Sequence, residues 1–139
     1  MDERYDIIRA VSDGRFRYIR NFEPLKPYYQ YMNTPEKGAT MKEIRRLEKT
    51  GGLSGAALLF SAGRKPVEEL YDLKNDPHQM NNLAGKVGYL KRQAELRDRL
   101  FVHLKKTKDP RALGQAEANK AAAMVPAVNR FRSNISRWF

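Results

Sequence analysis

Hydrophobic and polar positions alternate most clearly near the start of the chain. In residues 15–22 the even-numbered positions, three of them aromatic, fall on one face of an extended chain, and the odd-numbered positions fall on the other. Residues 5–11 alternate more weakly but contain good strand formers. Ser12-Asp13-Gly14 between the two runs is typical of a tight turn, because glycine supplies the positive φ that such turns need. The pattern predicts an antiparallel hairpin over residues 5–22.

A second extended run covers residues 67–73. It is short, apolar and aromatic, and it ends at Asn75-Asp76-Pro77. An Asx side chain can bond the backbone two residues on, and proline presets φ for a turn. This run is the natural third strand, since a lone hairpin is marginal in water. Met80, Leu83 and Ala84 follow at roughly helical spacing, which predicts one helical turn that folds back onto the strand.

Residues 89–107 have the strongest helical period in the chain. One stripe carries the apolar side chains and the opposite face carries the charges, so the helix can lie flat on a sheet. Shorter helices are predicted over residues 41–49, ended by Gly51-Gly52, and over residues 53–60. Residues 23–35 contain three prolines and are predicted to be a loop. The predicted stripe consists of Leu90, Ala94, Leu100, Phe101 and Leu104, widened by Tyr89 and Leu96.

These elements predict an α+β fold. A small antiparallel sheet, made of the hairpin 5–22 and the strand 67–73, is packed by the C-terminal amphipathic helix 89–107, with short helices in the 41–60 insertion. Its 139 residues suit one domain, since domains typically have about 100–200 residues. We expect residues 1–110 to form that domain and residues 111–139 to be a basic and aromatic tail, partly helical.

One stretch of the chain resembles a known family. Residues 69–84, E-L-Y-D-L-x-x-D-P-x-x-x-N-N-L-A, resemble the signature near the C-terminal end of sulfatases, which belong to the alkaline-phosphatase-like superfamily. Residues 2–22 resemble the first hairpin of the sulfatase C-terminal subdomain, and residues 27–31 resemble the loop after it. The resemblance covers roughly residues 2–110 in the right order. It implies that the chain is the C-terminal subdomain of an arylsulfatase-like protein, present as a fragment.

Sulfatases, which are sulfuric ester hydrolases, use a formylglycine made within a C/S-x-P/A-x-R motif and a divalent cation, usually calcium. This chain has no cysteine, and none of its serines opens such a motif; Ser61-Ala62-Gly63-Arg64 has the wrong spacing. The resemblance therefore implies no catalytic residue, no metal ligand and no cofactor in this chain, which we expect to be inactive alone. It also implies an N-terminal catalytic sulfatase domain as partner.

The same resemblance suggests where substrate would bind. The sulfatase C-terminal subdomain flanks the catalytic cleft, so the tyrosine-rich loop is a candidate wall of that cleft and an anionic, sulfated substrate is expected. Lys26, Tyr28 and Gln30 are the candidates there. His78 lies in the turn beside Asp76 and is a fourth candidate, because an imidazole titrates near neutral pH. The alternative is that these tyrosines cap the sheet's edge with their hydroxyls in water and that His78 is a solvated turn residue.

The charge of the chain keeps other functions open. The net charge of +11, from 27 Lys and Arg against 16 Asp and Glu, makes this a basic protein that would attract polyanions. A polyanion- or nucleic-acid-binding module would use Arg9, Arg15, Arg17 and Arg20 with residues 130–139, although no known nucleic-acid motif supports it. A third function is a self-associating structural domain, a homo-oligomer formed through exposed apolar surface.

The sequence holds few signals of cellular location. No apolar run approaches the ~18 residues of a membrane span, so no membrane partner is expected. The first residues are charged and show no secretory signal. Sulfatases as a family are often periplasmic, secreted or lysosomal, and the location of this chain stays open.

Overall fold

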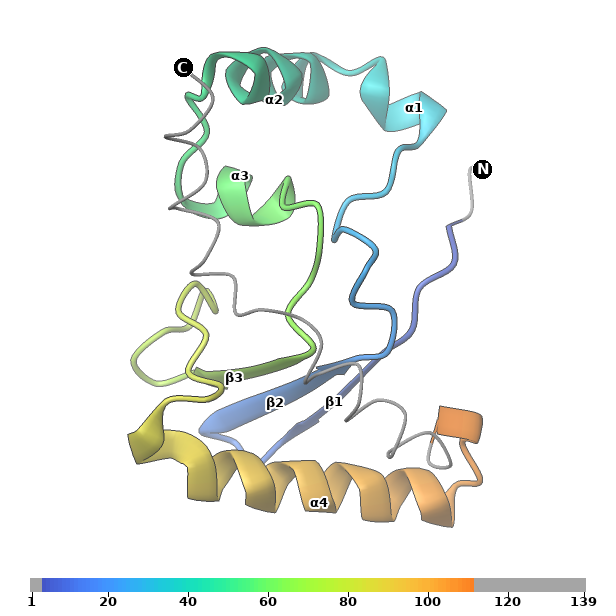
Figure 1. Cartoon of the computed structure of the whole chain (residues 1–139), viewed down its shortest axis with the longest axis vertical. Coiled ribbons are helices and arrows are strands. Elements are labelled where there is room, and N and C mark those ends of the chain that lie inside the picture. The colour runs from blue at the N-terminus through green and yellow to red at the C-terminus, as the bar shows by residue number, and fades with distance from the viewer. Residues whose placement is uncertain (1–3, 112–139) are drawn as a thin grey trace. The chain divides into compact units, whose positions relative to one another are not determined.

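A computed structural model of the chain describes residues 4–111, drawn as a cartoon in Figure 1. These residues divide into two compact units. The first contains residues 8–22 and 66–111, and the second contains residues 4–7 and 23–65. The predicted tail lies outside the described residues, except for Arg111.

A three-stranded antiparallel sheet forms the frame of the first unit, with strand order β1-β2-β3. The strands are β1 (Ile8–Ser12), β2 (Phe16–Asn21) and β3 (Glu68–Asp72). The Asp13 side chain accepts the N–H groups of Arg15 and Phe16, and Gly14 has φ +98°, so the turn is built as its residues predict. The hairpin and the third strand are both confirmed.

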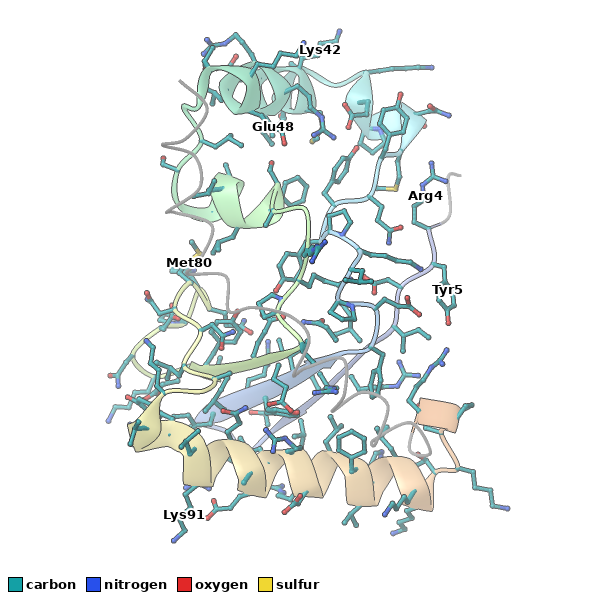
Figure 2. All side chains as sticks on the ribbon, viewed as in Figure 1. Arg4, Tyr5, Lys42, Glu48, Met80 and Lys91 are labelled. Atoms are coloured by element: carbon teal, nitrogen blue, oxygen red, sulfur yellow. The ribbon has the colours of Figure 1, made fainter. Side chains whose placement is uncertain are left out.

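Helix α4 (Leu90–Lys106), preceded by the short 3-10 helix η1 (Val87–Tyr89), lies along one face of this sheet (Figure 1). Lys91 points away from the strands (Figure 2), as the charged face of an amphipathic helix should. The predicted α+β fold with a C-terminal covering helix is therefore confirmed. The core between sheet and helix consists of Phe16, Tyr18, Leu70, Leu96, Leu100, Phe101 and Leu104.

The buried face of α4 differs from the predicted stripe at three positions. Leu90 is 49% exposed and Ala94 is also exposed, whereas Gln93 is buried. A sheet of only three strands, each five or six residues long, covers a narrow strip of the helix. Gln93 can lie in that strip because its amide has hydrogen-bond partners, Glu68 and the N–H of Gly85.

The segment after β3 also differs from the prediction, because residues 80–84 do not form a helical turn. The Leu83 N–H instead donates to the Leu70 carbonyl at 2.8 Å. Gln79, with φ +56°, lies in the turn that brings the chain back to β3. β3 is an edge strand whose outward backbone groups need partners, and this need overrides the local helical spacing.

Three helices form the second unit: α1 (Asn33–Glu36), α2 (Ala39–Thr50) and α3 (Gly55–Phe60). α2 ends as predicted, at Gly51 in the left-handed conformation with φ +69°. α1 begins within residues 23–35, which the sequence predicts to be a loop. The helix can form there because Pro35 lies in its first turn, where a helix tolerates a proline. Among the described residues, none of the helices is long and apolar enough to cross a membrane.

Candidate functional site

A polar cluster centred on Glu68 lies between β3 and α4. Arg97 binds the carboxylate through two hydrogen bonds of 2.7 and 2.5 Å. Tyr18 donates to it at 2.9 Å, Arg20 at 3.0 Å, and the Gln93 amide also donates. Burial by itself would raise the pKa of Glu68, but Arg97, Tyr18 and Arg20 hold it below its ordinary value of 4.5. Both oxygens of Glu68 accept hydrogen bonds, so this carboxylate links the helix to the sheet. It is not arranged to act as a general base.

Glu69, the next residue, faces the other side of the sheet. Its carboxylate accepts the Asn21 side-chain amide at 2.5 Å and the Tyr71 hydroxyl. Burial, together with this contact, raises the pKa of Tyr71. The expectation that adjacent strand residues point to opposite faces is confirmed, so Glu68 and Glu69 form no carboxylate pair.

His78 occupies the turn after β3 and is exposed. Among the described residues, no hydrogen bond joins it to the neighbouring Asp76 carboxylate. The Asp76 carboxylate accepts the backbone N–H groups of Met80, labelled in Figure 2, at 3.0 Å and of Asn81 at 2.7 Å. These two N–H groups lower the pKa of Asp76, with a smaller effect from the charge of His78. Asp76 therefore holds the turn, and His78 is left on its surface.

The tyrosine-rich loop of the second unit contacts the start of the chain. Lys26 and Gln30 both donate to the Tyr5 carbonyl, each at 3.1 Å. The Lys26 ammonium also lies 4.3 Å from the centroid of the Tyr5 ring. The Arg4 Nε donates to the Tyr31 carbonyl at 2.6 Å. These contacts place residues 4–5 alongside residues 26–31, and Figure 2 labels Arg4 and Tyr5 on that first segment.

The four candidate residues are thus divided between the two units. Lys26, Tyr28 and Gln30 lie together on one loop, where Tyr28 is 39% exposed, and His78 lies in the other unit. A substrate-binding role for all four stays a prediction.

Sequence reasoning counted Tyr31 in the tyrosine cluster of this loop but did not choose it, Arg4 or Tyr5 as a candidate, and all three are exposed. The register of the hairpin could have indicated that residues 4–5 lie near this loop. Ile8 pairs with Asn21, so the segments before and after the hairpin leave it side by side.

Each of the four hairpin arginines on which a nucleic-acid-binding function relied is engaged inside the first unit. Three of them pair with carboxylates and one donates to an amide. This leaves the net charge as the main support for that function within the described residues. The partners are Asp109 for Arg9 (2.8 Å), Asp72 for Arg15 (2.8 Å), Gln79 for Arg17 (3.2 Å) and Glu68 for Arg20 (3.0 Å).

Within residues 4–111 no cluster of the kind that sulfatase chemistry uses is present. The sequence contains neither a cysteine nor a serine that opens the C/S-x-P/A-x-R motif. In residues 4–111 no three His, Asp or Glu side chains gather where they could hold a cation.

Comparison with known proteins relates the chain to enzymes that act on sulfate esters. It is 41% identical over 99 residues to one ulvan-active sulfatase of Formosa agariphila and 32% identical over 97 residues to another. The matches cover 71% and 70% of this chain but 17% of each relative. No protein-family model matches the chain.

The chain is therefore sulfatase-related, a small α+β domain or fragment of that class. Among the sulfatases, the proteins that it matches are ulvan-active. It spans about a sixth of the length of these curated relatives.

Proposed function

We propose that this chain is the C-terminal subdomain of a sulfatase, and that it completes the fold of the parent hydrolase and flanks its substrate cleft. The observation that carries the proposal is the unequal coverage of the match, about 70% of this chain but only 17% of the relatives. Most of a sulfatase therefore lies outside this region. The missing nucleophile motif agrees with that division, since the reacting half belongs elsewhere.

The candidate residues suit an anionic sugar chemically. A tyrosine ring such as that of Tyr28 offers an apolar face and a hydroxyl, and the Lys26 ammonium can pair with a sulfate. Gln30 and His78 add hydrogen-bonding groups. In the parent, the N-terminal domain would hold the divalent cation and the formylglycine, which stabilise charge on the sulfuryl oxygens. This chain would position the sugar beside that centre.

The experiment is complementation with a relative. An ulvan-active sulfatase of Formosa agariphila is truncated to remove its region that matches this chain, and the remainder is coexpressed with the 139-residue chain. We expect aryl-sulfate hydrolysis by the reconstituted pair and none by either part. The Leu100→Asp variant, whose core we expect to be lost, is the negative control. Failure of the pair to associate or hydrolyse, with the intact relative active, would overturn the proposal.

Self-association is a second candidate, and helix α3 favours it. Leu58, Leu59 and Phe60 are 54%, 42% and 37% exposed, an apolar surface that the described residues cover only in part. In the intact sulfatase this surface would meet the rest of the protein. For the chain alone, light scattering at several concentrations measures the oligomer: a mass that rises with concentration supports association, and a constant monomer mass excludes it.

A further inference from the structure

We infer that Arg4, Tyr5 and Tyr31 form a binding surface for a sulfated carbohydrate, with the tyrosine rings against the sugar and the guanidinium of Arg4 on a sulfate group. The inference takes its substrate class from the proposed function. It assigns the contact with the ligand to three residues that were not among the four candidates, of which Tyr31 belongs to the tyrosine-rich loop. In this arrangement Lys26 and Gln30 also hold the backbone of Tyr5 in place.

The exposure of the two rings is the first reason. Tyr5 and Tyr31 are each 57% exposed, although most aromatic side chains of this size are largely buried. They lie on neighbouring segments, because the Arg4 Nε donates to the Tyr31 carbonyl. Leu25, on the same loop, is 67% exposed. Exposed large apolar groups on neighbouring segments are typical of a contact surface.

The backbone beneath Tyr5 is fixed while its ring is exposed. Its carbonyl accepts hydrogen bonds from Lys26 and Gln30, at 3.1 Å each. The next residue, Asp6, pairs with Lys65, whose side chain is fully buried. Ile7, one residue further, is also buried. A ring held in this way loses little conformational freedom on binding, which favours affinity.

The charges beside the rings suit an oxyanion. Arg4 uses its Nε on the Tyr31 carbonyl, and its two Nη groups make no hydrogen bond within residues 4–111. Terminal guanidinium nitrogens bind tetrahedral oxyanions through paired hydrogen bonds. The Lys26 ammonium lies over one face of the Tyr5 ring. A sugar on the ring's exposed side would therefore have a cation close to its sulfate groups.

Nucleic acid is the other polyanion that aromatic rings and cations bind. Two observations favour the sulfated sugar. The proteins that the chain matches are ulvan-active sulfatases. The four hairpin arginines on which nucleic-acid binding would rely are engaged by partners within the first unit.

The experiment measures binding of the 139-residue chain to dextran sulfate by titration calorimetry, with uncharged dextran and single-stranded DNA as parallel probes. The variants are Tyr5→Ala, Tyr31→Ala and Arg4→Gln. Arg99→Gln removes the same charge from an exposed position on α4 and is the matched control. Tyr5→Phe keeps the ring. Circular dichroism shows whether each variant is folded.

We expect each of the three site variants to weaken dextran sulfate binding about ten-fold, the effect of losing one stacked ring or one paired sulfate contact. Arg99→Gln should weaken it less than about two-fold, as expected for one distant surface charge. Tyr5→Phe should retain binding, and uncharged dextran should bind more weakly than dextran sulfate.

If Arg4→Gln and Arg99→Gln weakened dextran sulfate binding equally, the binding would depend on net charge alone, and the inference would be overturned. Unchanged dextran sulfate binding in both tyrosine variants would also overturn it. So would single-stranded DNA binding that is tighter than dextran sulfate binding and is lost in the tyrosine variants. The binding assay needs no catalytic half. Failed complementation with normal variant-sensitive binding would therefore reject the proposed function alone, and the reverse result would reject only this surface.

Discussion

The side chain of Asn82 pairs with the backbone of Leu70 at the free edge of β3. Its Oδ1 accepts the Leu70 N–H at 3.0 Å, and its Nδ2 donates to the Glu68 carbonyl at 3.1 Å. The same oxygen accepts the Ala84 N–H at 2.9 Å. One amide thus satisfies backbone groups that a further strand would otherwise pair. The Asn-Asn-Leu-Ala end of the sulfatase-like signature therefore has a structural role.

Replacement of Asn82 by alanine should destabilise the first unit. The Leu70 N–H would lose its acceptor, and an unsatisfied buried group costs about 1–3 kcal/mol. We expect the urea midpoint of Asn82→Ala to fall accordingly. Asn81→Ala is the matched control, since the Asn81 side chain is exposed and only its backbone N–H contacts Asp76. Equal midpoints for the two variants would show that the Asn82 amide carries no stability.

The Glu68 cluster should make stability depend on acid pH. The folded chain lowers the pKa of Glu68 below its ordinary value of 4.5. A carboxyl whose pKa is lower in the folded state stabilises the protein above its unfolded pKa, and this contribution is lost as the pH falls through the folded pKa. The urea midpoint should therefore decline below about pH 4.5.

Glu68→Gln isolates the Glu68 contribution from that of the other carboxyls. At pH 7 it should cost about 3 kcal/mol or more, because Arg20 and Arg97 lose the charge that compensates them. The difference from the wild type should narrow as the pH falls below 4.5. Glu95→Gln, at an exposed carboxyl, should change little at either pH. A difference that stays constant down to pH 2 would contradict the assigned ionisation of Glu68.

Leu100 should tolerate neither charge nor truncation. It is 3% exposed in the core between α4 and the sheet. Leu100→Asp would bury a charge without a partner, and we expect an unfolded chain by circular dichroism. Leu100→Ala should fold but lose about 2–5 kcal/mol, the usual cost of this truncation in a core. The urea midpoint measures the loss.

Val102, two residues along the same helix, is the control for Leu100. It is 67% exposed, so Val102→Asp should retain the wild-type circular dichroism spectrum and nearly the wild-type midpoint. Unfolding of Val102→Asp, or folding of Leu100→Asp, would show that the buried face of α4 is wrongly assigned.

The isolated chain should not hydrolyse aryl sulfates. Its sequence provides no cysteine and no serine in the nucleophile motif. Purified 139-residue chain, incubated with an aryl sulfate and with or without added calcium, should show the rate of the buffer blank. Hydrolysis that copurifies with the chain through two columns and depends on the cation would refute this prediction.

The sequence predicted the local elements well where one residue type decides the backbone. Gly14 and Gly51 stand where the chain needs a positive φ: the hairpin turns at Gly14, and α2 ends at Gly51. The prediction was weaker where a buried face depends on its partner. Leu90 satisfies the helical period yet is 49% exposed. The helical period could not predict this exposure, because it contains no information on how far the sheet extends.

For the candidate site, the sequence supplied the loop and the residue types but not their contacts. Lys26 and Gln30 were chosen as ligand-binding groups, and the structure shows both bonded to the Tyr5 carbonyl, more than twenty residues away along the chain. Whether these two side chains also reach a substrate stays a prediction. Tyr5 and Arg4 could be placed beside that loop only after the register of the hairpin was known.

The sequence by itself determined the periodic strands, the amphipathic helix, the turns at Gly14 and Gly51, and the absence of a sulfatase nucleophile. These features depend on steric limits and on the spacing of neighbouring residues, which a linear sequence contains. Tertiary structure decided that Asn82 pairs with the edge of β3 and that Glu68 forms an ion pair with Arg97. Both pairings join residues far apart in the sequence, and their energy depends on burial and alignment that only the folded chain provides.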